Sequence, residues 1–153
     1  MSTLVHAPAA PAFERVVRGP LVTWRVFRVG TDGETLRGVA HKVRWPAGAV
    51  MVATCEKTGH AAPQLDCTCG LHGWASLRDA LAQDRNDDDV IAMVALWGRC
   101  VVHSDGVRAE HGFIVGLLQE SPAYLHVDRY HRIAARYGVP LFAFEGGTVN
   151  APR

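Results

Sequence analysis

Four metal-binding side chains lie within a stretch of fifteen residues, and this cluster constrains the fold more than any other feature of the sequence. Cys55, His60, Cys67 and Cys69 follow the spacing Cys-x4-His-x6-Cys-x-Cys, and Gly70 comes directly after the last cysteine. Structural zinc requires four thiolate or imidazole ligands in a tetrahedron, and three cysteines with one histidine are a standard set. We therefore predict a zinc ion at these four residues. Because four protein ligands leave no coordination position for water, this zinc is expected to be structural.

Alternatives to a zinc site are reduced buried thiols, a disulfide and an iron–sulfur cluster. The one-residue gap between Cys67 and Cys69 is shorter than is usual in zinc knuckles, and a disulfide between them would be strained. Residues 69–74, Cys-Gly-Leu-His-Gly-Trp, resemble the second ligand box of a Rieske centre. The first box, Cys-x-His, is missing, because an acidic and a basic residue follow Cys55. Zinc is therefore the preferred interpretation.

The fourth ligand has two candidates, because His72 is a substitute for His60. If the metal were bound only by Cys55, Cys67 and Cys69, water would take the fourth position and a nearby histidine would act as acid–base. In that alternative the protein is a metal-dependent enzyme. The fourth cysteine of the chain, Cys100, lies in an apolar strand pattern and is expected to be a buried core thiol.

Length and composition indicate one globular domain. The chain has 153 residues, of which 48% are hydrophobic and 20% charged. We expect flexible tails at residues 1–12 and 146–153 and a single domain at 13–145. The 16 basic and 15 acidic residues give no support to nucleic-acid binding, which usually needs a basic excess. The first residues lack a secretory pattern and no apolar run is long enough to span a membrane, so a cytoplasmic location without membrane contact is expected.

Hydrophobic periodicity predicts an α+β fold: a bent, mostly antiparallel sheet or small open β-barrel, with two helices and the zinc-binding loop. One helix should begin after Ser76, a capping residue, and another should end at Tyr137, before Gly138. The start of the second helix is open between Pro122 and the position after Asp128. The expected strands are 13–29, broken at Gly19-Pro20, and 36–45, 90–103, 107–118 and 141–144.

The strands 90–103 and 107–118 flank Asp105-Gly106, a strong signal for a two-residue hairpin turn. That turn would place His103 opposite Arg108. One face of the hairpin would then be core, with Leu96, Cys100, Val102, Ala109, Phe113 and Val115. On the other face, a candidate ligand-binding group would consist of Trp97, Arg99, His103, Arg108 and Glu110. The alternative for this face is a solvated surface with an ion pair between Arg99 and Glu110.

No serine or cysteine has the local setting of a catalytic nucleophile, so a binding module is preferred over an enzyme. Its expected partner is a small anionic or planar ligand, such as a nucleotide or modified base, or a peptide, held by arginine and tryptophan. A regulatory protein-interaction domain is a further alternative. The acidic run Asp87-Asp88-Asp89 is interpreted as a solvated loop, although three carboxylates are also suited to a divalent cation.

Several short motifs resemble those of a family of small bacterial proteins for which no activity is known. They are Trp45-Pro46, Ala53-x-Cys55, His60-x-Ala62-Pro63, Cys67-x-Cys69-Gly70, Trp97-Gly98-Arg99, His103, Gly106, Arg108-Ala109-Glu110 and Tyr137-Gly138-Val139-Pro140. The resemblance covers most of residues 21–140 and implies that the cysteine loop and the hairpin belong to one domain. The chain departs from it at His72-Gly73-Trp74, where an aromatic residue and alanine are expected, and this departure argues against His72 as an essential ligand.

Overall fold

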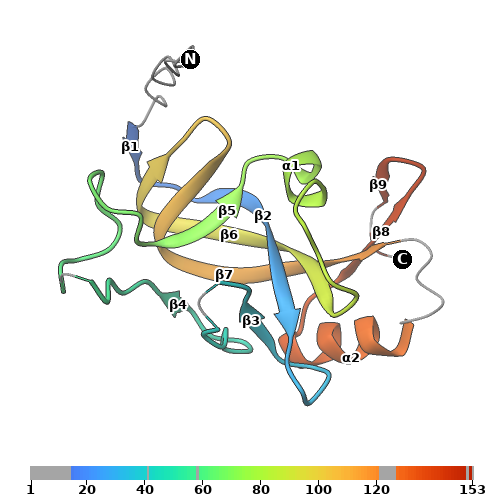
Figure 1. Cartoon of the computed structure of the whole chain (residues 1–153). Helices are drawn as coiled ribbons and strands as arrows, with labels where there is room; N and C mark the ends of the chain where they lie inside the picture. The colour runs from blue at the N-terminus through green and yellow to red at the C-terminus, as the bar shows by residue number, and fades with distance from the viewer. Residues whose placement is uncertain (1–14, 41, 58, 121–126, 151, 153) are drawn as a thin grey trace, which may run out of the picture.

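The computed structural model describes residues 15–40, 42–57, 59–120, 127–150 and 152. In this part of the chain, nine strands form one mixed sheet, and two helices pack against it (Figure 1). The α+β class and the dominance of the sheet are therefore as predicted. The elements are β1 (Arg15–Val17), β2 (Leu21–Val29), β3 (Leu36–Gly38), β4 (Met51–Val52), β5 (Leu71–Trp74), α1 (Leu77–Leu81), β6 (Asp89–Val102), β7 (Gly106–Glu120), α2 (Val127–Tyr137), β8 (Leu141–Glu145) and β9 (Thr148–Asn150).

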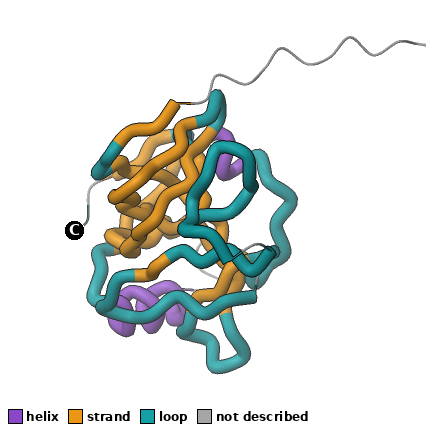
Figure 2. Tube along the Cα trace, turned by 90° about the vertical axis from the view of Figure 1, so that its left-hand side faces the viewer, coloured by secondary structure: helices purple, strands orange, loops and turns teal. Residues whose placement is uncertain are grey.

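The sheet is bent because four of its strands pair in a ring. Strand β6 pairs with β2, β2 with β5, β5 with β7, and β7 again with β6, all antiparallel. Strand β8 joins the far edge of β7 in parallel and then pairs with β9. The loop between β4 and β5 and the tip of the β6–β7 hairpin lie at one end of the sheet, and α2 lies towards the other (Figure 1). Figure 2 shows the long loop segments (teal) running beside the strands.

Hydrophobic side chains on both sides of the sheet form the core. The larger cluster includes Phe27, Leu36 and Leu96 and receives Ile133 and Tyr137 from α2. A smaller cluster on β6 and β7 packs against Ala80 of the short helix α1. Tyr137 of α2 also holds the β3 region, because its hydroxyl accepts the Leu36 amide hydrogen at 2.9 Å and donates to the Trp45 carbonyl at 2.8 Å. Neither described helix is long and apolar enough to span a membrane.

Several predicted boundaries agree with the structure. The break between the first strands falls at Gly19-Pro20, where Gly19 has a φ of 47°. Ser76 caps α1, its side chain accepting the Asp79 amide hydrogen at 3.1 Å. Helix α2 ends at Tyr137, and the alternative start at Pro122 lies outside the described residues, as does the predicted tail at 1–12. The predicted tail at 146–153 contains a strand, because β9 adds three residues to the sheet.

The β6–β7 hairpin exists, but its predicted register is wrong. Val102 pairs with Val107 and Val101 with Arg108, and the His103 amide donates to the Gly106 carbonyl at 2.8 Å, so the two turn residues are Ser104 and Asp105, one position before the predicted Asp105-Gly106. A bulge around Gly98, which has a φ of 75°, inserts one extra residue into β6 between Trp97 and Cys100.

The changed register also alters which side chains enter the core. A second register shift falls between Met93 and Val94 of β6, and Ile114 then lies opposite Val94. Because residues directly opposite each other share a face, Ile114 enters the core with Val94. The predicted core residues Phe113 and Val115 are only partly buried.

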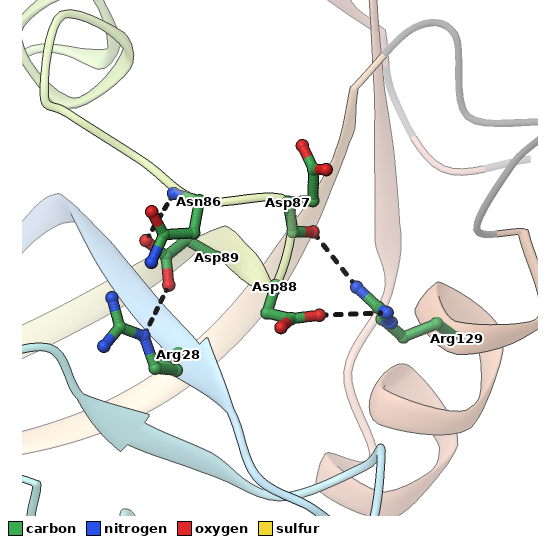
Figure 3. A network of polar contacts seen from close by, with 6 residues as sticks. All are labelled: Arg28, Asn86, Asp87, Asp88, Asp89 and Arg129. Carbon is green, nitrogen blue, oxygen red and sulfur yellow. Dashed lines mark hydrogen bonds and ion pairs between the residues drawn. The ribbon is translucent and has the colours of Figure 1, made fainter.

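The acidic loop before β6 is fastened at two places (Figure 3). Asp89, whose side chain is 1% exposed, accepts Arg28 Nε of β2 at 3.1 Å and the Asn86 amide at 2.9 Å. Arg129 of α2 donates to the Asp87 carbonyl at 3.1 Å and pairs with the Asp88 carboxylate at 3.3 Å. The interpretation of this run as a merely solvated loop is therefore wrong for Asp89, which joins β2 to β6.

Candidate metal centre and neighbouring cavity

The loop between β4 and β5 brings four metal-binding side chains to one point. The ligand atoms of Cys55, His60, Cys67 and Cys69 all lie within 4.8 Å of one another. Cys55 Sγ is 3.8 Å from Cys67 Sγ, and His60 Nε2 is 3.2 Å from Cys69 Sγ. In a zinc tetrahedron, bonds of about 2.3 Å to sulfur and about 2.0 Å to nitrogen place two sulfurs about 3.8 Å apart and sulfur and nitrogen about 3.5 Å apart. The four side chains are therefore close enough to hold a metal ion.

The sulfur positions argue against the disulfide alternative. All four cysteines lie in the described part of the chain, and none forms a disulfide. Burial raises the pKa of the Cys69 thiol, and its contacts with Cys67 and Cys55 raise it further. The Cys69 thiol thus resists ionisation unless a cation is present, and a bound divalent metal would reverse this preference. Cys100 is fully buried in the main hydrophobic core, as expected for a core thiol.

Local backbone geometry shapes the metal-binding loop. Gly70 has a φ of 119°, a conformation that residues with a side chain rarely adopt. A Cβ atom at this position would lie 3.0 Å from Pro63 Cβ and 3.1 Å from Arg108 Cβ. Glycine after Cys69 therefore allows the loop to turn closely against both β7 and the buried Pro63.

Arg108 of β7 fastens this loop to the sheet. Its side chain reaches beneath the loop, and the residue is only 3% exposed. The Nη1 atom donates to the carbonyl oxygens of Gln64 at 3.0 Å and Cys69 at 2.8 Å, and also to that of Cys67. Its Nε donates to His103 Nε2 at 2.7 Å. One guanidinium thus holds the backbone beside two of the four candidate ligands, and within the described residues it forms no ion pair with a carboxylate.

His72 does not belong to the cluster. Its Nε2 lies 2.9 Å from the Thr68 carbonyl oxygen, and the residue forms part of β5 opposite Arg108. Burial of the ring lowers the pKa of His72, and the charges of Arg25 and Arg108 lower it further. Of the two predicted candidates for the fourth ligand, the structure therefore places His60 in the metal-binding group.

The five residues of the predicted ligand-binding face fall into two separate groups. His103 and Arg108 bond to each other beneath the metal-binding loop. Near the bulge, Glu110 accepts the backbone amide of Arg99 at 3.2 Å and pairs with His111 at 3.2 Å. The Trp97 ring lies against His111, with ring centroids 5.8 Å apart, and Arg99 is exposed. The bulge at Gly98 separates these groups, because it breaks the alternation on which the predicted face depended.

A cavity of about 420 Å³ is lined by residues of β2, β5 and the hairpin turn, and the metal-binding loop leads directly into β5. The cavity lies where the edge of β2 changes partners: Trp24 pairs with β5, and pairing with β3 begins at Phe27. Its polar lining includes Arg25, His72, Trp74, Gln83, His103 and the exposed residues Asp84 and Asp105. His103 connects this wall to the metal-binding loop through Arg108.

Sequence reasoning identified His103 but missed the cavity. No local sequence signal places β5 and the hairpin turn beside Arg25. Comparison with models of known protein families, with curated proteins and with solved structures finds no match. The resemblance described from the sequence therefore stays a prediction.

Proposed function

We propose that the chain is a non-enzymatic binding module, folded around a structural zinc ion, that takes up a small ligand in the cavity beside the zinc loop. The observation that carries this proposal is the convergence of four protein ligand atoms within 4.8 Å, on a loop held by the buried Arg108. The zinc would fix the loop, and the loop and Arg108 would support one wall of the cavity.

Zinc is the metal that suits this donor set best. Three thiolates and one imidazole favour a tetrahedral ion of borderline softness, and oxygen-preferring ions such as magnesium and calcium are poorly matched. A zinc ion with three thiolates carries a net charge of about −1. The Arg108 guanidinium would offset this charge, which gives a reason for an arginine beneath the loop without a carboxylate partner in the described residues.

The number of protein ligands favours a structural over a catalytic role. Catalytic zinc sites keep one position for water or substrate, whereas Cys55, His60, Cys67 and Cys69 would fill all four positions. The free energy of metal binding would then contribute directly to folding.

The cavity is preferred over the Trp97, Arg99 and Glu110 surface as the ligand site. Its volume of about 420 Å³ is within the ~300–1000 Å³ typical of small-molecule sites. It combines an aromatic ring with several polar groups, as such sites usually do. A concave site of this size suits a small molecule better than a nucleic acid or a folded protein partner.

Native mass spectrometry of the freshly purified chain tests the proposal. We expect one zinc ion per chain and, in part of the population, a small co-purified ligand. Zinc X-ray absorption spectroscopy should find three sulfur ligands, one nitrogen ligand and no water. A bound water with fewer protein ligands would favour the metal-dependent enzyme instead. A folded, metal-free chain would contradict the structural role of zinc.

A further inference from the structure

Arg25 presents a positive charge to the cavity at the point where β2 changes partners. The residue lies between Trp24, which pairs with β5, and Phe27, which pairs with β3, and its side chain lines the cavity wall. Burial lowers the pKa of Arg25 to about 10, which still leaves the guanidinium charged at neutral pH. The cavity therefore has a permanent cation in its wall.

The orientation of this guanidinium is fixed by its neighbours. Nη1 donates to the His72 carbonyl oxygen of β5 at 2.6 Å. The Cζ atom lies 5.3 Å from the ring centroid of Phe27 and 5.2 Å from that of Trp45, within the range of cation–π contact. A cation held in this way loses little conformational entropy when it binds a ligand, because its position is already set.

In the part of the chain that the structure describes, Arg25 lacks the negative partner that Arg28 and Arg129 have. Arg28, on the same strand, pairs with Asp89, and Arg129 pairs with Asp88. Within the described residues, Arg25 forms no ion pair, and its Nε is shielded from solvent without a hydrogen-bond acceptor. An unpaired donor that is shielded from solvent is costly, and a negatively charged group in the cavity would stabilise the guanidinium charge through space.

The charges around Arg25 also favour a negatively charged ligand. His103, which also lines the cavity, is bonded to the cation of Arg108. The carboxylates of Asp84 and Asp105 oppose an anion, but both residues are exposed, so water and salt screen them. The Trp74 ring in the wall offers an apolar surface for the body of a ligand.

We infer that the cavity binds a small molecule that carries an oxyanion, a carboxylate or a phosphate, and that Arg25 is the residue that binds this group. Arginine suits both anions because its planar fork of donors matches two oxygen atoms of either one. The inference rests on the proposed function, since it names the ligand class of the same cavity.

The test uses three probes that share a phenyl ring: benzoate, phenyl phosphate, and benzamide, the neutral analogue of benzoate. Each is titrated into the zinc-loaded full chain while NMR records the Arg25 Nε–H and Trp74 indole N–H signals. We expect at least one anionic probe to shift both signals saturably and benzamide to shift neither. The relative affinities of benzoate and phenyl phosphate distinguish a carboxylate from a phosphate ligand.

Two matched variants assign the effect to one side chain. Arg25→Gln should weaken binding of the preferred anion at least about tenfold, because it removes a charge-assisted contact. Arg99→Gln, which changes an exposed arginine of the originally predicted face, should leave binding unchanged. If Arg25→Gln does not fold, the comparison of benzoate with benzamide on the unmodified chain still decides.

Three results would overturn the inference. Equal binding of benzamide and benzoate in the cavity would leave a binding module without anion recognition. Loss of binding in Arg99→Gln but not in Arg25→Gln would move the site to the predicted face. No response of the cavity signals to either anion, up to the solubility limit, would remove the anion site, and the binding module would then depend on the ligand found by native mass spectrometry.

Discussion

The two ends of the sheet are fastened by different chemistry. At the acidic-loop end, Arg28 and Arg129 are neutralised by the carboxylates of Asp89 and Asp88, so the polar contacts are complete within the protein (Figure 3). At the metal-loop end, the partners of Arg108 among the described residues are backbone carbonyls and His103. Three thiols lie near Arg108, and burial and contacts with the other two raise the pKa of one of them, Cys69.

The comparison favours a bound cation at the metal-loop end of the sheet. A metal ion would convert the thiols to thiolates and place negative charge near Arg108. The positive charge of Arg108 would then be balanced, as the charges of Arg28 and Arg129 are. Zinc should therefore matter for the loop end of the sheet and much less for the end at which α2 packs.

Replacing a metal ligand should have the largest effect. Cys69→Ser should abolish zinc retention and lower the free energy of unfolding by several kcal/mol, a large part of the ~5–15 kcal/mol of a typical domain. Metal analysis and urea unfolding measure the two effects. The control is Cys100→Ala in the core, which should keep the zinc. Equal zinc loss in both variants would remove the distinction between a ligand and a core thiol.

The second-largest effect is expected from replacing Arg108, which holds the metal-binding loop. Arg108→Met would leave three loop carbonyls without their donor. We expect the free energy of unfolding to fall by roughly 3–5 kcal/mol and zinc retention to weaken. Competition with a chelator measures zinc affinity in the same samples. Arg99→Met, on an exposed arginine of the same hairpin, should change neither quantity. Unchanged stability of Arg108→Met would mean that the loop is held by the metal alone.

Breaking the acidic-loop contact should have a smaller effect. Asp89→Asn removes the charge that pairs with Arg28, but its amide oxygen can still accept a hydrogen bond. We therefore expect the free energy of unfolding to fall by about 1–3 kcal/mol. Zinc content should stay at one ion per chain, because Asp89 is the first residue of β6, whereas Arg108 holds the loop opposite Val101, near the other end of this strand. Loss of zinc in Asp89→Asn would show that the two ends are not independent.

The smallest expected effect is an acid-dependent one at Asp32. Hydrogen bonds from the backbone amides of Thr35 and Glu34 hold the pKa of Asp32 at about 2, below its ordinary value of 3.8. Because the pKa is lowered by folding, the stabilisation is complete above pH 3.8 and is lost as the pH falls towards 2. Asp32→Asn should remove this part of the acid dependence, measured by thermal unfolding between these pH values. An unchanged profile would contradict the role of these hydrogen bonds.

Local signals in the sequence were sufficient for several elements and for the metal site. The Cys-x4-His-x6-Cys-x-Cys spacing predicts the cluster because all four residues belong to one loop. Ser76 and Gly19-Pro20 mark boundaries through their own backbone preferences. Each of these features depends on residues close together in the chain, and pattern reasoning is strongest there.

Features that depend on distant segments were not predictable in the same way. The bulge at Gly98 changes the register of β6 against β7, and a residue pattern read along one strand does not reveal it. Arg108 was expected on an open face, but it lies beneath a loop about forty residues earlier in the chain. Arg25 becomes part of a cavity only because β5 and the hairpin turn pack beside β2.

The role of zinc can be tested by amide hydrogen exchange, compared between the zinc-loaded chain and the chain treated with a strong chelator. We predict that removing zinc abolishes protection in residues 53–57 and 59–74 and in the hairpin turn near Arg108, whereas the core of α2 and the β2–β6 pairing at Asp89 keep most of theirs. If the treated chain contains no metal and both ends exchange as slowly as before, the metal does not hold the loop and this prediction is wrong.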